Sequence, residues 1–167
     1  MIWKVGNEAE ADRGEDVVPV LLLAAVIVAV DQWSKFYIQS QMSLGMSIPV
    51  IPNIFHLTYI LNPGAAFGIL ENQRFFFVAI AAVMVGAVVY LYPRIPEKPA
   101  LLRLGIGLMA GGAVGNVIDR VKTGYVVDFF DFRIWPIFNI ADIAIVVGVA
   151  CIIYTLLFIT EKEDEAS

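Results

Sequence analysis

Three aspartates in an otherwise apolar and aromatic segment are the first residues of this chain whose types and spacing suggest chemistry. Asp128 and Asp131 belong to "YVVDFFDFRIWPIFNIADIAI" (residues 125–145), and Asp142 follows where this segment runs into a long apolar stretch. A carboxylate beside hydrocarbon is costly unless it is paired or protonated. Two carboxylates can hydrolyse an amide without a metal or a histidine, because one takes a proton from water while the other hydrogen-bonds the scissile carbonyl. Two of these aspartates are therefore candidates for acid–base hydrolysis.

The surroundings of the aspartates suggest which one holds a proton. When two carboxylates are crowded together, one of them retains its proton. Asp142 is expected in the first turn of a helix, where the helix dipole favours the anion. An aspartate of the preceding loop, in apolar surroundings, would then hold the proton, and the two roles can exchange during the cycle.

The composition indicates an integral membrane protein. Of the 167 residues, 59% are hydrophobic and only 16% are charged, which leaves too little polar surface for a soluble domain of this size. We expect a single domain over residues 1–167. The net charge of −5 comes mostly from the two acidic ends, and no basic patch indicates binding to nucleic acid. With one cysteine, Cys151, and one histidine, His56, the chain has no internal disulfide and no metal-binding motif, and we expect no cofactor.

Four apolar stretches are long enough to cross a bilayer, which needs about 20 residues per helix. The chain is therefore predicted to be an all-α membrane protein with four transmembrane helices, at about residues 17–37, 75–92, 100–118 and 140–160. The connections at about 38–74 and 119–139 would lie on the outer side. In the first of these, "SIPVI" and "IFHLTYIL" have the composition of strands, so we expect a small sheet on the membrane surface. The later outer loop can either add a strand to this sheet or pack beneath it.

Four helices put both termini on one side of the membrane. Lysines and arginines are divided almost equally between the two sides, but the short "PRIPEKPALLR" loop is the most basic segment. Basic loops favour the cytoplasm, so both termini are expected there.

The unusual polar residues all fall at the outer ends of the predicted helices or in the outer loops. Asp31 and Lys35 are one turn apart near the outer end of the first helix. The others lie at the end of the third helix, at the start of the fourth and in the first outer loop; they are Asn116, Asp119, Arg120, Asn139, Asn62, Gly64 and Phe67. Independent placement would put half of them at the other face, so the one-sided arrangement indicates a site.

Taken singly, these residues have structural explanations. Asp31 and Lys35 can form an interfacial ion pair, and "GGAVGN" can be a helix-packing surface. Asn139 and Asp142 can form a helix cap, while "NPGAAFG" can be a simple turn. Asp119 and Arg120 can tie the third helix to the loops. None of these explanations accounts for the shared face.

A small transporter or channel is the main alternative, because ionisable residues inside a membrane also mark ion pathways. A pathway requires such groups along the full depth of the membrane. The inner halves of the second and fourth predicted helices have none, and Arg103 at the start of the third is the exception. An assembly subunit would explain the small residues but leaves the aspartates without a role.

Five blocks of the sequence resemble, in order, the motifs of bacterial lipoprotein signal peptidase, also called signal peptidase II. They are "DQWSK" (31–35), "NPGAAFG" (62–68), "GGAVGNVIDR" (111–120), "GYVVDF" (124–129) and "FNIAD" (138–142), within a resemblance that covers about residues 17–160. The resemblance implies an aspartic endopeptidase of the bacterial inner membrane with four transmembrane helices. Such an enzyme removes the signal peptide from prolipoproteins just before a cysteine that carries diacylglycerol, takes its substrate from membrane lipid and is inhibited by globomycin.

The resemblance places the catalytic pair on Asp128 and Asp142. It gives supporting roles to Asp31, Lys35, Asn62, Gly64, Asn116, Asp119, Arg120 and Asn139, and places Phe67 in the substrate pocket. Asp131 is not part of the pattern. In an extended segment it would point away from Asp128 and could pair with Arg133 or Lys122, so we interpret it as structural.

Overall fold

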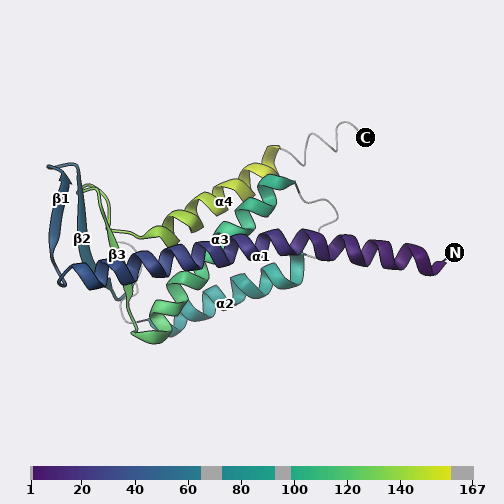
Figure 1. Ribbon diagram of the computed structural model, residues 1–167, viewed down its shortest axis with the longest axis horizontal. Coiled ribbons are helices and arrows are strands. Elements are labelled where there is room, and N and C mark those ends of the chain that lie inside the picture. Colours follow the sequence, from purple (N-terminus) through teal and green to yellow (C-terminus); the bar gives the residue numbers. More distant parts are fainter. Residues whose placement is uncertain (1, 65–72, 93–98, 159–167) are drawn as a thin grey trace.

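The computed structural model describes residues 2–64, 73–92 and 99–158, and for residues 2–16, 74 and 91 the backbone alone. Within these ranges the chain forms helices and strands in the order α1 (Ile2–Gln41), β1 (Ser47–Ile51), β2 (Phe55–Asn62), α2 (Arg74–Leu91), α3 (Ala100–Lys122), β3 (Val126–Asp131) and α4 (Ile140–Phe158). The helices run side by side as a bundle, and the strands form a small sheet at one end of it (Figure 1). The chain is therefore mostly helical, as the sequence predicts.

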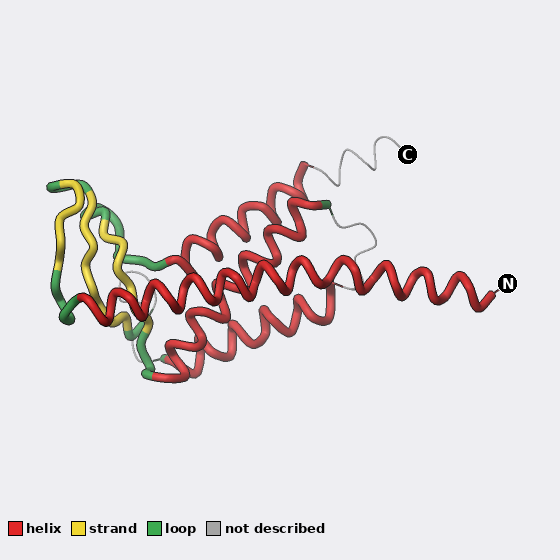
Figure 2. Tube along the Cα trace, viewed as in Figure 1, coloured by secondary structure: helices red, strands yellow, loops and turns green. Residues whose placement is uncertain are grey.

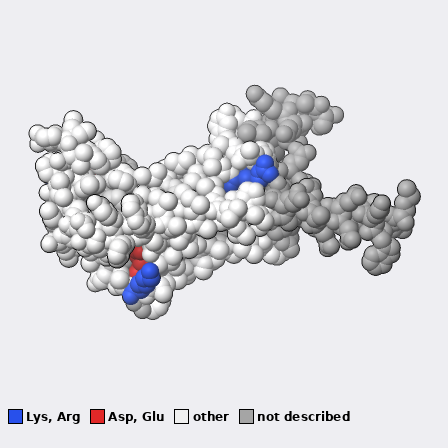
Figure 3. Space-filling view, in the orientation of Figure 1, with Lys and Arg blue, Asp and Glu red and all other residues white. Residues whose placement is uncertain are grey.

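Three helices are long and apolar enough to cross a membrane. They are the segment Val17–Gln41 of α1, Ala100–Lys122 and Ile140–Phe158, whereas α2 contributes a shorter apolar segment, Phe75–Tyr90. Large apolar side chains face outward along all of the helices, such as Leu22 on α1, Val83 on α2 and Val146 on α4. On the face shown in Figure 3, charged side chains of the described residues gather near the two ends of the bundle and leave its middle uncharged. This surface suits a hydrocarbon environment.

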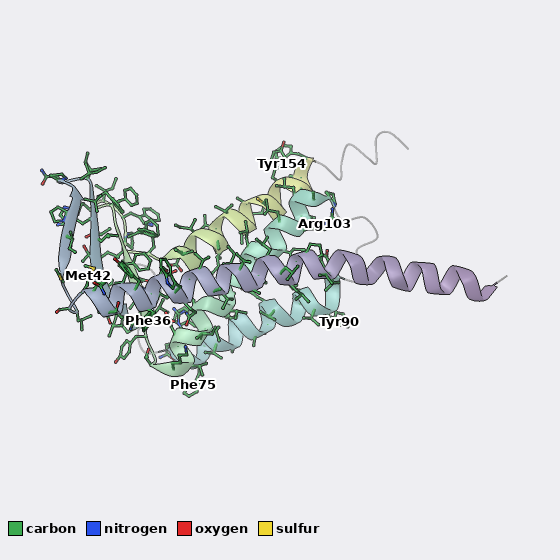
Figure 4. The ribbon with its side chains drawn as sticks, in the orientation of Figure 1. Phe36, Met42, Phe75, Tyr90, Arg103 and Tyr154 are labelled. Atoms are coloured by element: carbon green, nitrogen blue, oxygen red, sulfur yellow. The ribbon has the colours of Figure 1, made fainter. Side chains whose placement is uncertain are left out.

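Aromatic side chains mark both ends of the apolar part of the bundle. Phe36 and Phe75 lie toward the sheet, whereas Tyr90 and Tyr154 lie at the opposite end, as does Arg103 (Figure 4). Tyrosine and tryptophan favour the membrane–water boundary. The part of the bundle between these two groups of aromatic side chains is therefore the part that hydrocarbon would cover.

Glycines let α3 approach its neighbours closely. A side-chain carbon at Gly112 would collide with the carbonyl oxygen of Ala141 in α4, and one at Gly105 would lie 2.7 Å from the carbonyl oxygen of Gly148. A carbon at Gly115 would lie 2.6 Å from a carboxylate oxygen of Asp31 in α1. The small residues of "GGAVGN" are thus a packing surface, and they bring α1, α3 and α4 together beneath the sheet.

The sheet is antiparallel throughout, with strand order β1-β2-β3 (Figure 2). "SIPVI" corresponds to β1, and "IFHLTYIL" matches β2 to within one residue. The later loop adds β3, which is one of the two arrangements that the sequence allowed. Ile38 and Met42 at the end of α1 pack under the sheet against Tyr59, Val127 and Phe129. This apolar contact fixes β3 to the bundle.

Two helices extend further than the sequence analysis predicts. α1 begins at Ile2 and ends at Gln41, instead of spanning 17–37, and α3 continues to Lys122 instead of ending at 118. The extra turn of α1 is held by burial of Ile38 against the sheet. That of α3 carries Asp119 and Arg120, whose contacts are made from the helix and not from a loop.

Candidate active site

Asp128 lies in the middle of β3, opposite Ile60 of β2, and its side chain is almost completely buried. Its two carboxylate oxygens accept hydrogen bonds from asparagine amides. Asn62 at the end of β2 donates to Oδ2 at 2.9 Å, and Asn139 before α4 donates to Oδ1 at 2.7 Å. The carboxyl group is therefore fixed from both sides.

Asp142 is held in the first turn of α4 by a helix cap. Its backbone N–H donates to Oδ1 of Asn139 at 2.9 Å, and the backbone N–H of Asn139 donates to Oδ2 of Asp142 at 3.1 Å. This reciprocal pair is a capping box, with Asn139 as the N-cap. Asn116 of α3 donates to the other oxygen of Asp142 at 2.8 Å. The cap suggested by the sequence is present, and it also orients the carboxylate.

Asn139 connects the two aspartates. Its side chain is fully buried, and its amide nitrogen reaches Asp128 while its amide oxygen caps the helix that carries Asp142. The same nitrogen lies 3.1 Å from Oδ1 of Asn116. A single asparagine thus sets the position of one carboxyl relative to the other.

The electrostatics of the pair differ from those of isolated carboxyls. Burial, followed by the nearby charge of Asp142, raises the pKa of Asp128 from its ordinary 3.8 to about 7. The hydrogen bonds from Asn62 and Asn139 act in the opposite direction and are outweighed. At neutral pH, Asp128 therefore holds a proton in a large fraction of molecules, as expected for the acid of such a pair.

A buried ionic cluster lies on the bundle side of the pair. Nζ of Lys35 is 2.8 Å from Asp31 in the same helix and 3.0 Å from Asp119 in α3, and it donates to Oδ1 of Asn116 at 3.0 Å. The last contact turns the amide nitrogen of Asn116 toward Asp142. The lysine charge thus orients the asparagine that holds a catalytic candidate.

The carboxylates of this cluster also hold backbone groups beside the pair. Asp31 accepts from the backbone N–H of Ala141 at 3.1 Å, and Asp119 accepts from that of Val127 at 3.2 Å. These contacts tie α1 to the start of α4 and α3 to β3. Among the described residues, no buried side-chain nitrogen or oxygen lacks a hydrogen-bond partner.

Arg120, Asn62 and Gly64 form a second hydrogen-bonded group beside the pair. Arg120 donates to the carbonyl oxygen of Gly64 at 2.9 Å and lies 4.5 Å from the centre of the Phe77 ring. The backbone N–H of Gly64 donates to Oδ1 of Asn62 at 2.9 Å, which leaves the Asn62 amide nitrogen for Asp128. Phe67 lies outside the described residues.

Both aspartates line a cavity of about 380 Å³. Its polar lining includes Asn62, Asn116 and Arg120, and apolar side chains of α2, α3 and α4 form much of the rest, together with residues 135–138. No group of three or more His, Cys, Asp or Glu side chains in the described part of the chain could hold a metal ion. The arrangement offers two carboxyls, amide donors and an apolar wall, which suits acid–base hydrolysis of a lipid-bearing substrate.

Asp131 points away from the pair, as predicted for a residue three positions along a strand. It is buried and lies 2.9 Å from Nη1 of Arg133, one of the two partners proposed from the sequence. Lys122, the other, donates to Gln32 at 3.5 Å. Burial tends to raise the pKa of Asp131, but hydrogen bonds from Thr58 and Arg133 outweigh it and lower that pKa below its ordinary value.

Gln32 is the contact residue that the sequence analysis missed. Its amide nitrogen donates to Asp119 at 2.8 Å, and to Asp31 and the carbonyl of Gly115 at 3.2 Å each. It therefore bridges two carboxylates of the ionic cluster. Its position inside "DQWSK" was the available signal, but a glutamine next to an aspartate on a helix does not by itself indicate where its side chain points.

Comparisons with known proteins identify the family that this chain resembles. The family described as signal peptidase (SPase) II matches residues 23–158. The lipoprotein signal peptidase of Moorella thermoacetica is 50% identical over 139 residues, which cover 83% of this chain and 93% of that protein. The protein of the same name from Pelotomaculum thermopropionicum is 45% identical over 146 residues, or 87% and 96% of the two chains. A solved structure described as a bacterial membrane enzyme is 40% identical, with a TM-score of 0.80 over 86% of this chain and 90% of the other.

Proposed function

Because the chain belongs to the signal peptidase II family of aspartic peptidases, we propose that Asp128 and Asp142 are its catalytic pair. The observation that carries this assignment is the shared cavity in which each carboxyl is held by asparagine amides and Asn139 contacts both. Three other ionisable groups near the pair are bound to each other, Lys35 to Asp31 and Asp119.

The proposed mechanism divides the work between the two aspartates. Asp142, ionised at the N-terminal end of α4, takes a proton from a water molecule, which attacks the scissile carbonyl carbon. Asp128, protonated, donates a hydrogen bond to the carbonyl oxygen and stabilises the charge that develops there. When the tetrahedral intermediate collapses, the proton gained by Asp142 passes to the leaving amine, and the C–N bond breaks. The raised pKa of Asp128 supports its assignment as the acid.

The proposed substrate is a prolipoprotein whose cysteine carries diacylglycerol, cut on the N-terminal side of that cysteine. The names of the relatives support a lipoprotein substrate. The cavity supports a lipid-bearing one, because apolar residues such as Ile80, Met84 and Ile145 line it next to the aspartates. Arg120, Gly64 and Phe67 would contact the peptide near the pair. Globomycin-type inhibitors are expected to compete for this cavity.

We propose that all four helices cross the bacterial inner membrane, with both termini in the cytoplasm and the active site near the outer surface. The start of α1 and the end of α4 lie at the end of the bundle opposite the sheet, which supports a common side for both (Figure 1). Exposed Trp33 and Tyr37, stacked at 5.9 Å near the end of α1, support an outer boundary beneath the sheet.

Cysteine labelling tests this orientation. In a Cys151→Ser background, Ser43→Cys beyond α1 should react with a membrane-impermeant maleimide in intact cells. Ala100→Cys at the start of α3, which is also exposed, should react only after the cells are permeabilised. The reverse pattern would overturn the proposed orientation.

A cleavage assay tests the catalytic pair. Purified protein in a bilayer is given a diacylglyceryl-modified prolipoprotein, and the released signal peptide is measured. Asp128→Asn and Asp142→Asn should each abolish cleavage with the fold retained, whereas Asp131→Asn, the matched control from the same strand, should keep most of it. EDTA should leave the rate unchanged, because two carboxyls activate water without a metal. Full activity of either catalytic variant would refute the pair.

The transporter alternative receives no support from the ionisable side chains. In the described part of the chain, the buried aspartates and lysine are Asp31, Lys35, Asp119, Asp128 and Asp131, all at the sheet end of the molecule. An ion pathway would need them along the whole depth of the bundle.

A further inference from the structure

A closed loop leads from β3 to α4 and borders the active-site cavity. We call residues 132–138 the cavity loop. Its two ends meet because Phe138 pairs with Phe130: the backbone N–H of Phe130 donates to the carbonyl of Phe138 at 2.8 Å, and the reverse bond is 3.2 Å long. Trp135, Pro136 and Ile137 line the cavity that contains Asp128 and Asp142. The position of this loop therefore determines the shape of one cavity wall.

Asp131 holds the first turn of the cavity loop. Its Oδ1 accepts the backbone N–H of Arg133 at 2.9 Å, while its Oδ2 accepts the hydroxyl of Thr58 and the guanidinium of Arg133, at 2.8 and 2.9 Å. Asp131 is only 4% exposed, although it lies at the end of a strand. Three donors thus converge on one buried side chain outside the catalytic pair.

The backbone at Arg133 needs this support. Its φ is 65°, in the left-handed region that residues other than glycine adopt only at an energetic cost. A side-chain oxygen that accepts the N–H two residues later is the usual means by which an aspartate stabilises such a turn. The contact between Asp131 and the guanidinium of Arg133 stabilises the turn less than this hydrogen bond does. The Arg133 side chain is half exposed, so solvent screens the ion pair.

The other end of the cavity loop is already fixed by the catalytic machinery. Phe138 is followed by Asn139, which is fully buried and contacts both aspartates. Stacked rings of Phe132 and Phe138, 5.9 Å apart, connect the two ends. The direction in which the loop leaves β3 is therefore set at Asp131, and this in turn sets where Trp135 meets the cavity.

We propose that Asp131 is a positioning residue that holds the cavity loop against the bound substrate, and so sets substrate affinity without taking part in the chemical step. This inference rests on the proposed peptidase function, because the loop lines the cavity of that site. Within the described part of the chain, the side-chain hydrogen bonds of Asp131 go to Thr58 and Arg133 and not to the catalytic pair. An effect on substrate affinity can therefore be separated from an effect on the chemical step.

Steady-state kinetics of two variants test the proposal. Asp131→Ala removes all the acceptors, and the loss of about two net hydrogen bonds should raise KM about tenfold or more with kcat nearly unchanged. Asp131→Asn should restore KM, because its amide oxygen still accepts the N–H of Arg133. Its amide nitrogen can donate to Thr58, whose hydroxyl can turn to Ser47 at 2.8 Å. Arg133→Gly, which suits the positive φ, should stay close to the original KM.

The outcomes separate positioning from general stability. A kcat that falls in Asp131→Ala while KM is unchanged, or an Asp131→Asn variant as poor as the alanine variant, would overturn the proposal. Amide hydrogen exchange gives a second measurement that needs no cleavage: residues 133–135 should exchange faster in Asp131→Ala than in Asp131→Asn. Normal exchange in the alanine variant would contradict the role of Asp131. If the unmutated protein cleaves no prolipoprotein, the proposed function fails, while the exchange experiment still decides whether Asp131 holds the loop.

Discussion

Replacing Asp128 with asparagine should change how the stability of the fold depends on pH. In the folded protein the pKa of Asp128 is about 7, against an ordinary value of 3.8. The folded state therefore binds this proton more tightly than the unfolded chain does. The resulting stabilisation is fully present below about pH 4 and is lost as the pH rises through about 7, because the carboxylate must then be buried beside Asp142. An asparagine side chain at this position cannot ionise, so the variant escapes this loss.

The size of the effect follows from the two pKa values. Each pKa unit corresponds to about 1.4 kcal/mol, so ionisation of Asp128 destabilises the fold by on the order of 4 kcal/mol at high pH. Between pH 5 and pH 8 the expected part of that change is roughly 3 kcal/mol. The asparagine also brings a cost that does not depend on pH. Asn62 and Asn139 both donate to Asp128, so one of them would face an amide nitrogen, at about 1–3 kcal/mol.

The measurement is unfolding of both proteins in detergent micelles by sodium dodecyl sulfate, followed by tryptophan fluorescence at pH 5 and pH 8. At each pH, the free energy of unfolding of the unmutated protein is subtracted from that of Asp128→Asn. This difference should increase by roughly 3 kcal/mol from pH 5 to pH 8. Ionisable groups that do not interact with Asp128 cancel in this difference. Asp131→Asn is the control. The pKa of Asp131 is lowered in the folded protein, so its ionised form stabilises the fold, and this stabilisation is lost only as the pH falls below the ordinary aspartate pKa of 3.8. Between pH 5 and pH 8 this variant should therefore show no change relative to the unmutated protein. A difference for Asp128→Asn that is the same at both pH values would refute the reasoning.

Three further predictions concern activity and the packing beneath the site. Cleavage should decline as the pH rises above about 7, because Asp128 loses the proton with which it hydrogen-bonds the scissile carbonyl; a kcat/KM that stays constant up to pH 9 would count against this role of Asp128. Gly115→Ala places a carbon 2.6 Å from Asp31 Oδ2 and should lower the free energy of unfolding by about 1–3 kcal/mol, whereas Gly86→Ala, with nothing within 4 Å, should leave it equal or higher. Lys35→Met leaves Asp31 and Asp119 buried without their cation and should destabilise the fold by about 3–5 kcal/mol; unchanged thermal unfolding would show that the cluster is not coupled to folding.

The sequence predicted the fold where apolar runs and strand composition are strong. "SIPVI" matches β1, and the three helices that are long enough to span a membrane correspond to three of the four predicted apolar stretches. The fourth stretch corresponds to the shorter apolar helix Phe75–Tyr90. The helix ends were predicted less well. Ile38 and Lys122 lie beyond the expected ends because contacts with other segments, and not local composition, extend α1 and α3.

The site was predictable as a set of residues but not as a set of contacts. Asn62, Asn116 and Asn139 could be placed at one end of the molecule from their positions along the predicted elements. Which aspartate each amide meets depends on how the helices approach one another, and the glycines of α3 determine that approach. For the same reason Gln32 was missed, since its partners lie on α3, more than 80 residues away in the chain.

The two aspartates of the pair belong to different parts of the architecture. Asp128 is carried by a strand of the sheet, and Asp142 by a helix of the bundle, and the amide of Asn139 is where the two parts meet. Neither part alone contains both members of the proposed catalytic pair. A chain whose sheet has not yet docked on its helices would therefore have no proteolytic activity, so the order of assembly would itself protect neighbouring membrane proteins from cleavage by an incompletely folded enzyme.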